Sequence, residues 1–149
     1  MEFLKIGDTV RGIFDTINGN FSELSNKRKI VFSGSAAIPS NNSGNVNVIT
    51  TTTDLTKFDG LIFQRADCNA VTFFIPPAIG TVYKIVSGSA DFSQIMTGLN
   101  LFECNAEITA ANEITLSNNV YSGVKTNGAA RYIAGYTDNP LIKVIGFKV

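Results

Sequence analysis

The groups in this chain that could do chemistry are two cysteines and a few scattered carboxylates. Histidine is absent from the 149 residues, so imidazole cannot act as a base, as the partner of a nucleophile or as a metal ligand. Cys68 has Arg65 as its nearest cation in the sequence and Cys104 has none, so neither thiol has the base that a catalytic thiolate needs. We expect two buried or half-buried free thiols, with a Cys68–Cys104 disulfide as the alternative.

The carboxylates do not form a catalytic pattern. Asp54 and Asp59 lie on either side of Lys57 in a loop-like stretch, and Glu103 and Glu107 lie near predicted strands. A glycosidase needs two carboxylates about 5–9.5 Å apart across a cleft, and solvated charges explain these residues more simply. No stretch matches a calcium-binding loop or a phosphate-binding loop. The prediction is therefore a protein that is not an enzyme and has neither a metal site nor a cofactor.

Composition excludes several further classes. Twelve basic residues balance twelve acidic ones, and a formal net charge of zero offers no electrostatic footprint for nucleic acid. No apolar run approaches the roughly 20 residues that span a membrane. The start, Met1 to Lys5, lacks the features of a signal peptide, so we expect synthesis in a cytoplasm. The length suits one globular domain with a short appendage.

The first 28 residues form the predicted appendage, an amphipathic helix that begins near the N-cap residue Asp8. Its apolar residues recur at helical spacing on one face. They are Val10, Ile13, Phe14, Ile17, Phe21 and Leu24. Because Gly12 and Gly19 each cost about 1 kcal/mol relative to Ala, this helix must pack on something. The partner is either the chain's own β domain or the same helix in neighbouring subunits. We favour the second, with Asn20 as a polar layer in a short heptad seam.

From residue 29 to residue 149 the pattern changes to short strands separated by turn residues. The segments are Lys29–Ser33, Asn45–Thr53, Gly60–Arg65, Ala70–Ile75, Thr81–Gly88, Leu99–Ala106, Glu107–Thr109 or Glu113–Ser117, Ala130–Thr137 and Leu141–Val149. Asn118-Asn119 is predicted to be a turn, and Asp91–Met96 is a candidate for one or two helical turns. Spacings of this kind indicate an antiparallel β-sandwich or jelly roll.

Aromatic side chains raise the possibility of carbohydrate binding. Tyr121 and Tyr136 lie near turn signals, and Tyr121 is the candidate ligand-binding residue. Phe73, Phe74 and Phe102 fall within predicted strands and are expected in the core.

The segment from Gly7 to Leu24, GDTVRGIFDTINGNFSEL, resembles the N-terminal segment of many bacteriophage fibre, baseplate and appendage proteins. The apolar C-terminal run from Leu141 to Val149 also resembles the closing strand of small phage fibre-head domains. The resemblance implies a virion structural protein, usually a homotrimer that contacts other virion proteins. It assigns residues 1–28 to attachment or trimerisation and residues 29–149 to a projecting β-sandwich.

Three hypotheses follow. The first is a trimeric fibre, head-fibre or tail-appendage protein that is made in the host cytoplasm and located in the virion. Its predicted oligomerisation residues are Val10, Ile13, Ile17, Phe21 and Leu24. The alternative is a carbohydrate-binding module at the tip of a fibre, which recognises a host surface glycan through Tyr121. The third and weakest is a hydrolase of surface polysaccharide.

Overall fold

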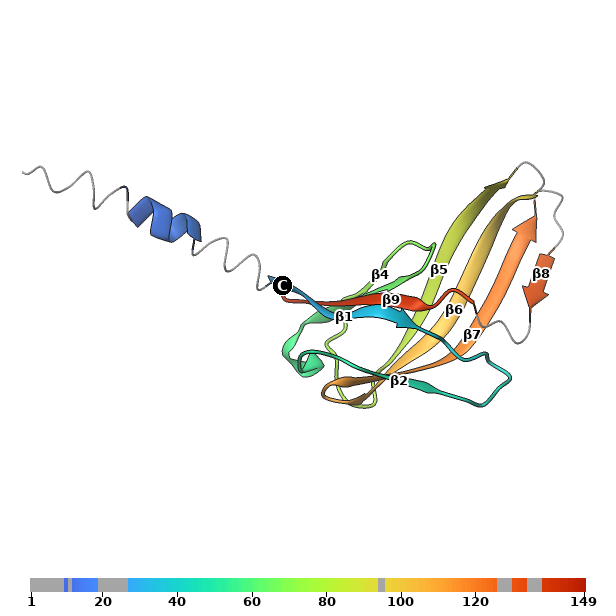
Figure 1. The fold of residues 1–149 in the computed structure, drawn as a ribbon, viewed down its shortest axis with the longest axis horizontal. Coiled ribbons are helices and arrows are strands. Elements are labelled where there is room, and N and C mark those ends of the chain that lie inside the picture. Colours follow the sequence, from blue (N-terminus) through green and yellow to red (C-terminus); the bar gives the residue numbers. More distant parts are fainter. Residues whose placement is uncertain (1–9, 11, 19–26, 94–95, 126–129, 134–137) are drawn as a thin grey trace, which may run out of the picture.

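The computed structural model describes residues 10, 12–18, 27–93, 96–125, 130–133 and 138–149, and within these ranges the chain is mainly β (Figure 1). The strands are labelled in chain order. They are β1 (Arg28–Ala36), β2 (Asn47–Thr50), β3 (Gly60–Arg65), β4 (Val71–Phe73), β5 (Val82–Ser93), β6 (Met96–Ala110), β7 (Glu113–Lys125), β8 (Ala130–Ile133) and β9 (Leu141–Phe147). A 3-10 turn, η1 (Leu55–Lys57), lies between β2 and β3, and residues 10 and 12–18 are helical.

The strands form two antiparallel sheets. One sheet has the order β1-β9-β3-β4, and the other has the order β2-β7-β6-β5, with β8 also pairing with β7. This arrangement confirms the predicted fold class, a mainly β protein of β-sandwich type with a short helix near its N-terminus. Because Arg28 pairs with Phe147, the start of β1 and the C-terminus lie at the same end of the sandwich (Figure 1).

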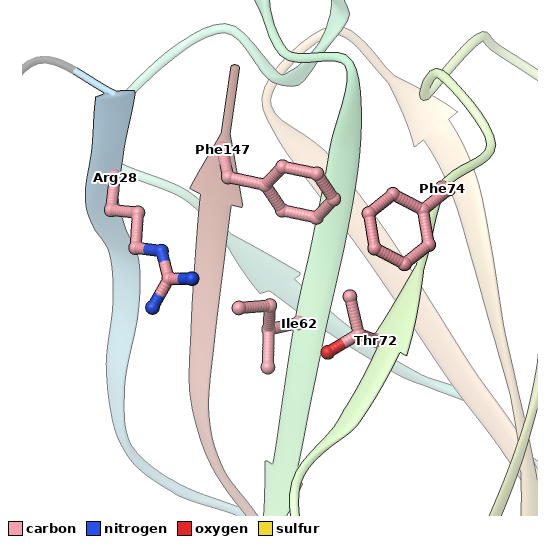
Figure 2. A pocket seen from close by; sticks show the side chains of 5 residues that line it. All are labelled: Arg28, Ile62, Thr72, Phe74 and Phe147. Atoms are coloured by element: carbon pink, nitrogen blue, oxygen red, sulfur yellow. The ribbon is translucent and has the colours of Figure 1, made fainter. Parts of the chain in front are cut away.

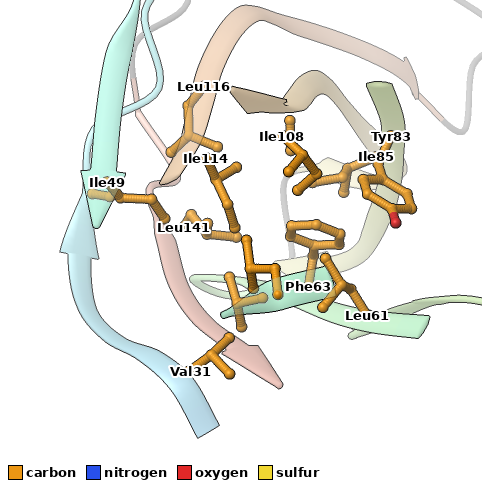
Figure 3. Packing of buried hydrophobic residues seen from close by; sticks show 14 of the residues in the cluster. Val31, Ile49, Leu61, Phe63, Tyr83, Ile85, Ile108, Ile114, Leu116 and Leu141 are labelled. Carbon is orange, nitrogen blue, oxygen red and sulfur yellow. The ribbon is translucent and has the colours of Figure 1, made fainter. Parts of the chain in front are cut away.

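The core lies between the sheets and follows the alternation expected of half-buried strands. In β3, Leu61 and Phe63 are fully buried, whereas Ile62 and Gln64 between and beside them are only partly buried. Figure 3 shows aliphatic side chains of both sheets meeting around Phe63. At one side of this core Phe63, Phe73 and Tyr83 form an aromatic trio with ring centroids 5.1–5.9 Å apart.

A turn predicted at Asn118-Asn119 is wrong, because these residues form a β-bulge inside the continuous strand β7. Glu103 pairs with Val120 and Asn105 pairs with Ser117, so the two asparagines oppose Cys104 alone. Asn118 takes the left-handed conformation, with φ 58°, which asparagine tolerates better than most residues. The extra residue turns Asn119 inward and places Tyr121 opposite Phe102.

Two further expectations are also wrong. The candidate helical turns at Asp91–Met96 are not formed, since residues 91–93 belong to β5 and Met96 begins β6, in a hairpin that pairs Ser93 with Met96. Phe74 is not in the core. It follows the end of β4, and 74% of its surface is exposed.

Candidate functional site

The N-terminal helix presents an apolar stripe to solvent. Val10, Ile13, Phe14 and Ile17 are 41–60% exposed, although their spacing places them on one face. We call these four residues the helix stripe. The other two residues predicted for this face, Phe21 and Leu24, lie outside the described residues. The role of the stripe in self-association stays a prediction, and its exposure means that a single copy of the chain leaves it uncovered.

Tyr121 lies within β7, on the inward side, and not beside a turn as the sequence predicts. Its ring packs against Phe102, with centroids 5.3 Å apart, and its hydroxyl donates a hydrogen bond to Asn100 Oδ1 at 2.7 Å. The side chain is half-buried. An aromatic ring beside an amide is a combination that can hold a sugar, and here the phenol proton is already donated to the Asn100 Oδ1 atom. Tyr136, the other candidate tyrosine, lies outside the described residues.

Sequence reasoning missed the most elaborate polar cluster, which is centred on Arg65 at the end of β3. Arg65 is only 1% exposed. It donates from Nη2 to Asn119 Oδ1 at 2.7 Å and from Nε to the carbonyl of Asn139 at 3.1 Å, and its guanidinium lies 5.4 Å from the centre of the Phe102 ring. A buried guanidinium needs several acceptors because its five N–H groups leave water on folding.

Asn119 extends this cluster to the loops. Its Nδ2 donates to the carbonyls of Ile38 and Asp138, at 3.3 and 3.0 Å. Its backbone N–H donates to the carbonyl of Pro39 at 2.8 Å. The Arg65–Asn119 pair therefore connects β3 and β7 to two loops and has a structural role. Its burial keeps it from a ligand in solution.

The cysteines belong to the same region and are both free. The Sγ atom of Cys68, which is half-buried, accepts a hydrogen bond from Asn139 Nδ2 at 3.0 Å. Burial raises the pKa of the Cys104 thiol to about 11, and the nearby Arg65 guanidinium opposes this shift. The sequence places no cation near Cys104, whereas folding brings Arg65 beside it. Its thiol is nevertheless held in the neutral, unreactive form.

The carboxylates are dispersed and serve local structure. Asp54 accepts hydrogen bonds from Thr56 Oγ1 at 2.6 Å and from Thr56 N at 2.9 Å, and these bonds lower the pKa of its carboxyl. Asp59 accepts from the backbone of Val149, and Glu103 forms an exposed ion pair with Lys84 at 2.8 Å. Within the described part of the chain, no three groups from His, Cys, Asp and Glu lie close enough together to hold a metal ion.

A small pocket opens on the outer face of the four-stranded sheet. Its volume is about 250 Å³, and it is lined by Arg28, Ile62, Thr72, Phe74 and Phe147 (Figure 2). The rings of Phe74 and Phe147 meet edge to face with centroids 5.3 Å apart. The Phe147 ring lies against Gly60, where a Cβ atom would collide with it, so this glycine creates the room for the aromatic pair.

No family model, curated protein or solved structure matches this chain. Among the described residues, no helix is long and apolar enough to cross a membrane.

Proposed function

We propose that this chain is a non-enzymatic structural protein of a bacteriophage virion, a homotrimeric fibre, head-fibre or tail-appendage component. It associates through its N-terminal helix and projects its β-sandwich. The observation that carries this proposal is the exposed helix stripe. A short helix with an apolar face is marginal alone in water, so burial of that face against another subunit would stabilise it.

Two further features support an assembly role. The segment around the stripe carries the resemblance to phage fibre and appendage proteins. Two of the buried polar residues that the structure describes, Arg65 and Asn119, join loops to strands, and the Cys104 thiol is buried. A β-sandwich whose loops are held to its strands by such contacts is a rigid element that can project from a particle.

The test is the mass of the full chain in solution, measured by light scattering after gel filtration. The wild-type chain is expected as a trimer. Ile17→Asp puts a charge into the helix stripe and is expected to yield monomers, because a buried unpaired carboxylate opposes association. Thr16→Asp is the matched control, since it adds the same charge one residue away, outside the stripe, and is expected to stay trimeric.

A monomeric wild-type chain, or equal masses for Ile17→Asp and wild type, would contradict the proposal. The alternative would then lead, namely a carbohydrate-binding module with Tyr121 on the ligand surface. The pairing of an aromatic ring with the Asn100 amide favours that second candidate over a hydrolase.

A further inference from the structure

The outer face of the four-stranded sheet carries an apolar patch. The neighbours Val31, Leu61 and Val144 point into the core, so the residues beside them, Ile30, Ile62 and Ile145, face outward. The strand register sets Ile30 opposite Ile145 and Ile145 opposite Ile62, which makes a continuous row across β1, β9 and β3. With Phe74 and Phe147 at one end, these residues form what we call the outer patch.

Two side chains of the outer patch are largely exposed. Ile30 is 52% exposed and Phe74 is 74% exposed. The pocket beside Phe74 has a volume of about 250 Å³. Pockets for drug-sized ligands occupy about 300–1,000 Å³, so this one suits one or two protein side chains better. Anchor residues of protein interfaces are often aromatic side chains that fill such a pocket.

The helix stripe matches the outer patch in size and in chemistry. From residue 10 to residue 17 a helix rises about 10 Å. The row from β1 to β4 crosses three strand spacings, about 14 Å in total. A charge pair is also available: Arg28 lines the pocket, and Asp15 is the charged residue among the described residues of the helix. Asp15 lies about 100° around the helix from Phe14, so it stands at the side of the helix when Phe14 points into the pocket.

We infer that the outer patch of one copy receives the helix stripe of a second copy, with Phe14 in the pocket and Asp15 near Arg28. This inference rests on the proposed function, because it names the surface that buries the stripe. A second copy is the occupant because one chain alone leaves the helix stripe exposed and, within the outer patch, Ile30 and Phe74 exposed. Contacts of this head-to-tail kind join unlike surfaces and can close into a ring, as a trimer requires.

The first experiment compares two aspartate substitutions in the full chain. Phe74→Asp removes one wall of the pocket and is expected to weaken association by at least about tenfold, as loss of an interface anchor does. Ile79→Asp is the matched control, because Ile79 is 67% exposed but does not line the pocket. The concentration dependence of the mass by light scattering gives the two association constants. Equal constants for the two variants would overturn the inference.

The second experiment does not depend on how Phe74→Asp folds. Phe14 is replaced by the photo-cross-linking residue p-benzoylphenylalanine, and subunits with natural and heavy nitrogen are mixed before illumination. Cross-links from position 14 of one isotope to β3, β4 or β9 of the other support the inference. Cross-links within one chain would show that the helix folds onto its own sandwich, and cross-links between helices would show a helical bundle. Either result overturns it.

The two proposals fail in different ways. If the helix forms a bundle with its copies, Ile17→Asp still dissociates the trimer while Phe74→Asp does not, and only the outer patch loses its role. If the wild-type chain is a monomer, the proposed function fails first and this inference fails with it.

Discussion

At the scale of single residues, the most consequential side chain is Arg65, a cation that is almost fully buried. Burying a charge costs several kcal/mol unless hydrogen bonds replace its water. Here Asn119 Oδ1 and the Asn139 carbonyl replace part of that water, and the Phe102 ring faces the guanidinium. The guanidinium is suited to this place because its fixed fork reaches acceptors on two different segments.

Arg65→Lys is expected to destabilise the protein by about 2–4 kcal/mol, because a single ammonium cannot reach both acceptors and leaves one of them buried without a donor. The free energy of unfolding from urea titration measures the effect. Lys84→Ala is the control, since its ion pair with Glu103 is exposed and is worth about 0–1 kcal/mol. Equal losses in the free energy of unfolding for the two variants would mean that the buried contacts of Arg65 do not stabilise the fold.

This cluster could not be predicted from the sequence. Arg65 stands at the end of a well-predicted strand, where a cation usually faces solvent. Its partner Asn119 lies 54 positions further along and is hidden in an Asn-Asn pair that is typical of turns. Only the pairing of β6 with β7, which a single sequence does not reveal, shows that this pair is a bulge and that one asparagine points inward.

At the scale of elements, that bulge decides which residues of β7 face the core. Asn118 is exposed and adopts φ 58°. Asn118→Val is expected to cost about 1–2 kcal/mol, because a side chain with a Cβ branch is strained in the left-handed region. Asn118→Gly is the matched variant and is expected to stay within about 0.5 kcal/mol of wild type, because glycine adopts this conformation without strain. Thermal unfolding of both variants measures the difference, and an unchanged Asn118→Val would argue against a strained bulge.

The strands themselves show where a sequence pattern suffices. Gly60–Arg65 is a short, largely apolar run that begins at a glycine, and β3 has the same bounds. The three long strands β5, β6 and β7 were predicted too short, because polar and glycine-rich stretches such as Ser87 to Ala90 resemble loops. Their partners supply the hydrogen bonds, and such pairing over long distances in the sequence leaves no local signal.

At the scale of the whole molecule, the two surfaces that are proposed to associate adjoin the same end of the β-sandwich. The helix precedes β1, the outer patch includes the first residues of β1, and β9 ends beside them (Figure 1). Association at this end would leave the far ends of β5, β6 and β7 free to project. That geometry suits a subunit that is attached at one end and exposed at the other, in line with the proposed virion role.

The pH dependence of global stability is also a property of the whole chain. With no histidine, no side chain has an ordinary pKa between 5 and 8, so the free energy of unfolding is expected to be nearly constant from pH 6 to 8. Burial raises the pKa of Cys104 to about 11 and that of Tyr83 to about 12. Both groups are neutral in the folded and unfolded states below about pH 7.5, so their full contribution to stability is present there.

Above about pH 8 the unfolded chain releases thiol protons that the folded chain keeps, and stability therefore falls as the pH rises. For Cys104 the loss amounts to about 2 kcal/mol by pH 11. Urea titrations of wild type and Cys104→Ala at pH 8 and pH 11 measure how much of the loss in unfolding free energy is due to the Cys104 thiol. The packing cost of the substitution is the same at both pH values. Only the difference between the two proteins in how the free energy of unfolding changes with pH therefore reports ionisation of the thiol. We expect the wild type to lose about 2 kcal/mol more than Cys104→Ala over this range. Parallel losses would mean that the Cys104 thiol ionises as readily in the folded chain as in the unfolded one.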